Sequence, residues 1–78
     1  MGSAVDSAKA EVVKYQALVE SEKRNKEEGK RVGNYQRASK NIRMADGKLV
    51  NDYDYKILKA QELLKKAKAN LAKAKSKK

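Results

Sequence analysis

The four arginines of this 78-residue chain all lie between residues 24 and 43, whereas the other sixteen basic residues are lysines. The arginine guanidinium is a planar group with five N–H donors that can grip a carboxylate or phosphate through two parallel hydrogen bonds, whereas the lysine ammonium is a hydrated point charge. This concentration of arginine indicates a recognition surface for an anionic partner. The candidate binding residues are Arg24, Arg31, Tyr35, Arg37, Lys40 and Arg43.

The sequence offers little that could perform catalysis. It contains no histidine and no cysteine, and neither Ser39 nor Ser76 has a base beside it in a known motif. The acidic cluster of Asn51, Asp52 and Asp54 does not have the twelve-residue spacing of a calcium-binding loop, and no glutamate closes it. We therefore expect a protein that is not an enzyme and that has no cofactor or metal site.

The net charge of +10 favours an anionic partner, and the charge is unevenly distributed. Residues 1–28 carry five basic and six acidic groups, whereas residues 29–48 carry six basic groups and one acidic group. The longest apolar run, 17–19, is far too short to span a membrane. The alanine-rich apolar positions also disfavour insertion into lipid. An acidic protein surface or a nucleic acid is thus the expected partner.

The last third of the chain carries the clearest structural signal. Apolar residues recur there at alternating spacings of three and four, which is typical of one packed face of a helix. They are Val50, Tyr53, Ile57, Ala60, Leu64, Ala67, Leu71 and Ala74. Asn51 can cap the helix, and Asp52 and Asp54 suit the positive end of its dipole. This pattern predicts a helix over about 52–75.

The first third repeats the pattern and predicts a helix over about 4–28. Its apolar positions are Val5, Ala8, Val12, Tyr15 and Val19, and Ser3 can cap its start. The twelve residues 20–31 have no apolar side chain. Three glutamates in this stretch precede a base by four positions, which favours a solvated extension of the helix. These pairs are Glu20–Arg24, Glu22–Lys26 and Glu27–Arg31.

The middle of the chain shows a shorter repeat. Tyr35, Ala38, Ile42 and Ala45 recur at helical spacing, with Asn34 as a candidate cap and Gly47 as a candidate terminator. A helix over about 35–46 is predicted. Such a helix would place Arg37, Lys40 and Arg43 together on the face opposite its apolar residues, as either a solvated or a recognition face.

Antiparallel pairing of the first and last helices places Val5 opposite Ala74 and Val19 opposite Ala60. A simple hairpin turning at Gly47 would leave 5–18 without a partner, so the middle helix is expected to be an additional element. We predict an all-α protein in which residues 1–78 form a single helical domain, built as a small three-helix bundle with coiled-coil-like packing of its first and last helices. The alternative is a long helical hairpin whose overhang is covered by a second copy of the chain, which makes a homodimer a further candidate.

Together these features favour a helical protein–protein interaction or receptor-binding module. Its arginine-bearing middle would bind an acidic surface, with paired hydrogen bonds from Arg37 and Arg43. The alternative is a nucleic-acid-binding protein without sequence preference, in which Arg37, Lys40, Arg43 and the lysines of 65–78 would neutralise phosphates. A third interpretation is a helical scaffold with no ligand. The salt dependence of oligonucleotide binding would separate the first two.

Overall fold

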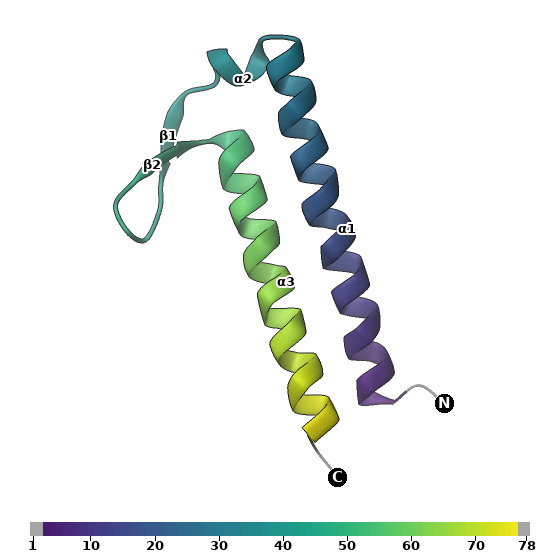
Figure 1. Cartoon of the computed structure of the whole chain (residues 1–78). Coiled ribbons are helices and arrows are strands. Elements are labelled where there is room, and N and C mark those ends of the chain that lie inside the picture. The colour runs from purple at the N-terminus through teal and green to yellow at the C-terminus, as the bar shows by residue number, and fades with distance from the viewer. Residues whose placement is uncertain (1–2, 77–78) are drawn as a thin grey trace.

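Two long antiparallel helices dominate the computed structural model, which describes residues 3–76 (Figure 1). The elements follow in the order α1 (Ala4–Arg31), α2 (Asn34–Arg37), β1 (Lys40–Arg43), β2 (Leu49–Asn51) and α3 (Asp52–Ser76). The molecule measures 51 × 27 × 13 Å, and α1 begins at the same end at which α3 finishes. The predicted all-α class and the antiparallel packing of the first and last helices are confirmed.

Helix α1 begins where the sequence predicts but continues beyond residue 28 to Arg31. The Ser3 hydroxyl accepts a hydrogen bond of 3.1 Å from the Asp6 amide, which satisfies one of the unpaired donors of the first turn. The helix ends because Gly33 adopts a left-handed conformation, with a φ of 86°, directly after the C-cap residue Val32. The polar stretch 20–31 is therefore entirely helical, three residues farther than its charge pattern predicted.

Helix α3 is capped by a buried side chain. The Asn51 side-chain oxygen accepts a hydrogen bond of 2.9 Å from the Asp54 amide, and Asn51 is only 1% exposed. Because a buried amide group is costly unless it is hydrogen-bonded, Asn51 fixes the point at which the chain leaves β2 and enters the helix. The cap and the predicted range of 52–75 are confirmed, since α3 spans Asp52–Ser76.

The core is a narrow strip between α1 and α3. Its buried apolar side chains are Ala8, Val19, Ala60 and Ala67. All four belong to the two predicted apolar seams, and the small alanines allow the helix backbones to approach closely. The pairing agrees with the predicted register, because Ala8 and Ala74 line one hollow at the open end of the hairpin. The N-terminal half of α1 is thus paired with α3, so the overhang proposed in the alternative hairpin is absent from the described residues.

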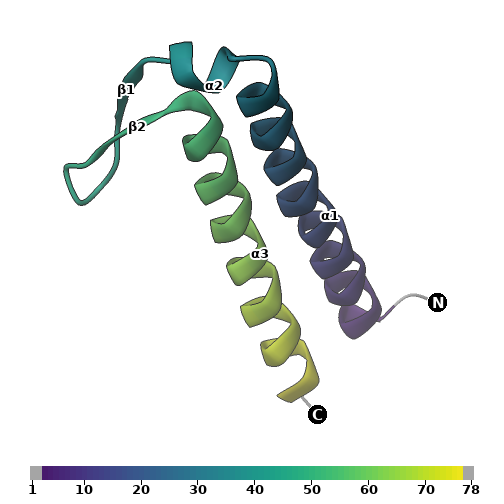
Figure 2. The same ribbon diagram turned by 45° about the horizontal axis from the view of Figure 1, so that its top comes forward.

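The predicted helix over 35–46 is wrong. Helix α2 ends at Arg37, and the chain then forms the antiparallel strands β1 and β2, in which Ile42 lies opposite Val50 and Arg43 opposite Leu49. The three-helix bundle is therefore replaced by a helical hairpin that carries a small β-hairpin. Figure 2 shows this β-hairpin projecting beside α3, on the side away from α1.

The turn between the strands explains why a helix does not form there. Gly47 has a φ of 86° and donates its amide to the Met44 carbonyl at 2.9 Å, while the Met44 amide donates to the Lys48 carbonyl at 2.8 Å. The Asp46 carboxylate accepts a 3.0 Å bond from the Lys48 amide. This is the three-residue hairpin loop with a glycine in the left-handed region, and Asp-Gly is a strong signal for hairpin turns.

Candidate functional site

The four arginines occupy three different elements near one end of the molecule. Arg24 lies in the C-terminal half of α1, while Arg31, Arg37 and Arg43 are the last residues of α1, α2 and β1. All four are exposed. This end, opposite the one at which α1 begins, is called the tip and comprises the C-terminal part of α1, α2, the β-hairpin and the first turns of α3 (Figure 1).

Arg37, Lys40 and Arg43 do not share one helical face as predicted. Arg37 ends a four-residue helix, whereas Lys40 and Arg43 are the first and last residues of a strand. The register of β1 is also irregular between Lys40 and Ile42. The alternation of a regular strand therefore does not place Lys40 and Arg43 on defined faces. The predicted site residues are therefore gathered at the tip, but on several elements that point in different directions.

The arginines at the tip differ in whether a carboxylate of the same molecule pairs with them. Arg31 binds the Glu28 carboxylate through both Nε and Nη2, and these hydrogen bonds lower the pKa of Glu28. Within residues 3–76, Arg24, Arg37 and Arg43 form no ion pair with a carboxylate. Arg43 instead donates to the Gly47 carbonyl at 3.3 Å.

The predicted Glu27–Arg31 pair of α1 is replaced by two contacts of different spacing. Arg31 pairs with Glu28 rather than with Glu27, and Glu27 pairs with Lys30 at 3.8 Å. Both pairs are three residues apart. The predicted Glu20–Arg24 and Glu22–Lys26 pairs are absent among the described residues, and Lys26 instead reaches across to Asp54 on α3.

Tyr35, one of the predicted binding residues, is engaged inside the tip. Its hydroxyl donates a hydrogen bond of 2.8 Å to the Asp54 carboxylate, and its ring centroid lies 6.0 Å from that of Tyr53. The ammonium groups of Lys26 and Lys30 lie 5.1 and 5.4 Å from the same ring, within reach of a cation–π interaction. Tyr35 therefore anchors α2 to both long helices.

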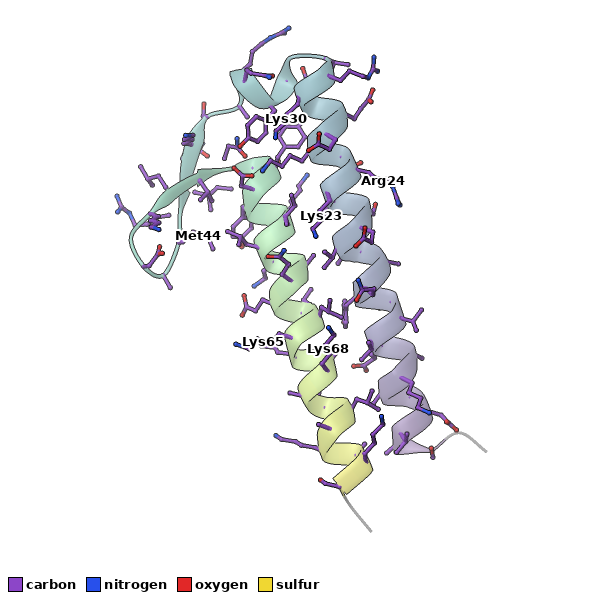
Figure 3. The ribbon with its side chains drawn as sticks, in the orientation of Figure 1. Lys23, Arg24, Lys30, Met44, Lys65 and Lys68 are labelled. Carbon is purple, nitrogen blue, oxygen red and sulfur yellow. The ribbon has the colours of Figure 1, made fainter. Side chains whose placement is uncertain are left out.

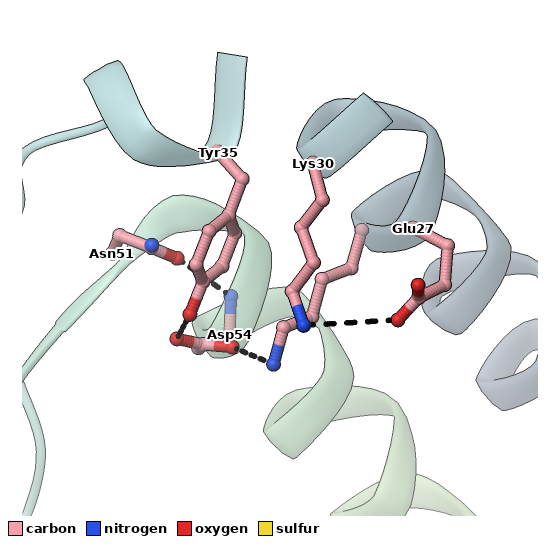
Figure 4. A network of polar contacts seen from close by, with 6 residues as sticks. Glu27, Lys30, Tyr35, Asn51 and Asp54 are labelled. Atoms are coloured by element: carbon pink, nitrogen blue, oxygen red, sulfur yellow. Dashed lines mark hydrogen bonds and ion pairs between the residues drawn. The ribbon is translucent and has the colours of Figure 1, made fainter. Parts of the chain in front are cut away.

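Asp54 is the centre of this polar network (Figure 4). One carboxylate oxygen accepts from Tyr35, while the other lies 2.7 Å from the Lys26 ammonium. Partial burial raises the pKa of Asp54, but the hydrogen bonds from Lys26 and Tyr35 and the charges of Lys26 and Lys30 outweigh it, so the pKa lies below its ordinary value. The hydrogen bond to Asp54 correspondingly raises the pKa of Lys26.

A close contact between the long helices completes this end of the molecule. A Cβ atom at Gly29 would lie only 2.8 Å from Cζ of Tyr53, so the ring occupies the space that any other side chain would need. We refer to Lys26, Gly29, Tyr35, Tyr53 and Asp54 as the tip lock. Sequence reasoning missed the lock, although the predicted antiparallel register places residue 26 close to residues 53 and 54.

The lysines of the predicted phosphate-binding stripe lie along α3 and not at the tip. Lys65 and Lys68 project from the middle of this helix (Figure 3). Lys66 pairs with Glu62 at 3.7 Å, whereas Lys65, Lys68, Lys73 and Lys75 form no ion pair within the described part of the chain. Residues 77 and 78 of the predicted stripe lie outside the described residues.

Comparisons of the chain with protein-family models, curated proteins and solved structures gave no match. None of the helices within residues 3–76 combines the length and apolar character needed to cross a membrane. In the same range, no cluster of three or more acidic residues is arranged to hold a metal ion. The assignment of function therefore depends on the tip and its charges alone.

Proposed function

We propose that the protein is a non-enzymatic helical interaction module whose basic tip binds an acidic protein surface. The observation that carries this proposal is the position of Arg24, Arg37 and Arg43. These exposed guanidinium groups lie at one end of an elongated molecule, and within residues 3–76 no carboxylate pairs with them. Each can therefore donate paired hydrogen bonds to a carboxylate of another molecule.

The tip lock supports this proposal because it organises the surface before a partner binds. Tyr35 and Asp54 join α2 to α3, and Lys26 joins α1 to the same carboxylate. Holding the three helices in one arrangement reduces the conformational entropy that is lost on binding. The lock itself uses Lys26 and Tyr35 internally, which leaves the arginines as the groups available to a partner.

The separation of arginine from lysine also favours a protein partner. A nucleic acid presents a continuous row of phosphates, to which lysine and arginine contribute similarly through charge. The exposed lysines along α3 resemble such a row more closely than the tip does. A surface that reads individual carboxylates gains more from the fixed geometry of the guanidinium group, and this group occurs only at the tip.

Fluorescence anisotropy with two labelled probes would test the proposal. The probes are a poly-glutamate peptide and a single-stranded oligonucleotide, each titrated at low and at physiological salt. The test variant combines Arg24→Ala, Arg37→Ala and Arg43→Ala. Its matched control combines Lys68→Ala, Lys73→Ala and Lys75→Ala, which removes the same charge from exposed, unpaired positions on α3.

We expect the arginine variant to bind poly-glutamate about 5- to 30-fold more weakly than the unaltered protein, because three exposed charge pairs together contribute about 1–2 kcal/mol. The lysine variant should bind it nearly as well as the unaltered protein. Equal losses of affinity in both variants would contradict a specific role of the tip and would mean that binding depends only on net charge. Tighter oligonucleotide binding that is lost in the lysine variant would replace the proposal with nucleic-acid binding.

A further inference from the structure

An open hollow of about 450 Å³ lies between the β-hairpin and α3. Four of the residues that line it are apolar and two are charged. The residues that line it are Met44, Ala45, Asp46, Lys48, Val50 and Leu58. Figure 3 shows Met44 beside α3, on the side of that helix that faces away from α1. The hollow is thus separate from both the helix–helix core and the tip lock.

The hollow leaves apolar surface in contact with solvent. Leu58 is 40% exposed although it lies on a helix whose outer positions are mostly charged. Met44 and Val50 are only half-buried. Because small soluble proteins seldom leave adjacent large apolar side chains exposed in a concavity, this surface is suited to receiving an apolar side chain from another molecule.

The charges around the hollow specify the chemistry of that molecule. Lys48 lines the hollow, and Lys65 lies two turns beyond Leu58 on the same face of α3. Neither forms an ion pair within residues 3–76. Two carboxylates lie nearby: Asp46, which lines the hollow and accepts a hydrogen bond from the Lys48 amide, and Glu62, which pairs with Lys66. Lys48, Lys65 and Lys66 outnumber these two carboxylates, so the charge around the hollow is net positive.

We propose that the hollow receives an apolar side chain from an acidic peptide segment of the partner protein, whose flanking carboxylates approach Lys48 and Lys65. This inference rests on the proposed function and adds the position and chemistry of a docking point. A nucleic acid offers no aliphatic side chain for the hollow. A flat anionic membrane would meet protruding apolar residues more readily than residues set within a concavity.

Two labelled peptides that differ only at their centre would test the inference. Both consist of glutamates, and one has a central Leu-Leu pair where the other has Ser-Ser. We expect the unaltered protein to bind the leucine peptide about tenfold more tightly, because burying about half of the apolar surface of the two leucines contributes a factor of this order. Leu58→Glu should remove the preference. Val13→Glu should keep it, because this matched control adds the same charge to an apolar position that is 69% exposed on α1.

A second variant, Ala45→Glu, places a carboxylate at the edge of the hollow without altering a helix. Ala45 lies in the exposed hairpin turn, so its substitution should also remove the preference while the circular dichroism of the helices is unchanged. Equal binding of the two peptides by the unaltered protein would overturn the inference while leaving the basic tip intact. Binding of neither peptide would overturn both proposals. Leu58-dependent binding to phosphatidylserine vesicles, without a leucine preference among peptides, would assign the hollow to lipid instead.

Discussion

The carboxylate of Asp54 holds three elements together with two oxygens. It receives the Tyr35 hydroxyl from α2 and the Lys26 ammonium from α1, while the Asp54 amide donates to Asn51 at the start of α3. Such a concentration of contacts on one ionisable group makes part of the stability of the tip dependent on the charge of that group. The pKa of Asp54 is lowered in the folded protein, so protonation weakens folding.

We expect Asp54→Asn to reduce the free energy of unfolding by about 1 kcal/mol at neutral pH, because the charged hydrogen bonds of a partly exposed carboxylate are lost. The contribution of Asp54 is present above its ordinary pKa of 3.8 and is lost as the pH falls through the lower pKa of the folded protein. Urea unfolding at a series of pH values would therefore show the two proteins converging in acid. A constant difference down to the lowest pH would contradict the assigned role.

At the scale of the element, the β-hairpin depends on the backbone conformation of Gly47. Its φ of 86° is unfavourable for side chains branched at Cβ, whereas asparagine tolerates this region. We expect Gly47→Val to destabilise the hairpin by about 1–2 kcal/mol and Gly47→Asn to have a smaller effect. Hydrogen exchange of the Met44 amide, which donates to Lys48, would report the change.

The long helices provide the control for this experiment, because the hairpin contributes none of the four buried apolar side chains of the core. Their thermal unfolding should change little in either Gly47 variant. Equal exchange rates at Met44 in the valine and asparagine variants would show that the turn does not require a left-handed residue. A large loss of helix in the valine variant alone would show that the hairpin is needed to form the helical pair.

The accuracy of each predicted element depends on the number of residues over which its sequence pattern repeats. The seams of α1 and α3 repeat over many turns, so their helices, caps and antiparallel register could be predicted from sequence. In the middle segment the helical spacing of Tyr35, Ala38 and Ile42 is brief. Strand-like alternation over 41–44 and the Asp46-Gly47 turn signal compete with it. The hairpin turn prevails because Gly47 permits the left-handed conformation and Ile42 pairs with Val50.

The candidate site was predictable only in part for a related reason. The clustering of arginines is a property of the linear sequence, and it survives in the fold because α1, α2 and β1 end close to the tip. The predicted orientation of Arg37, Lys40 and Arg43 assumed a helix over 35–46, and this helix does not form. The contacts of Tyr35 and Lys26 with Asp54 are tertiary, so they required both the correct register and the position of α2.

At the scale of the whole molecule, stability depends on a strip of core that is only two helices wide. Two of the most deeply buried apolar residues, Ala60 and Ala67, are each 1% exposed and carry only a methyl group. So little apolar burial provides a small stabilising free energy for a chain of this size. The close approach of α1 and α3 is therefore essential, because separating the helices would weaken the contacts along the entire seam.

This dependence predicts different outcomes for one substitution at two neighbouring positions of α3. Ala67→Leu inserts a large side chain between the helices and should destabilise the protein by about 1–3 kcal/mol. In a domain of this size that corresponds to a fall in Tm of about 4–8 °C for each kcal/mol. Ala69→Leu places the same side chain on the exposed face and should leave the Tm nearly unchanged, since alanine and leucine have similar helix propensities. Thermal unfolding followed by circular dichroism would distinguish the two.

A higher Tm for Ala67→Leu would mean that the helices can move apart to accommodate leucine. The close approach attributed to the alanines would then not be required for stability.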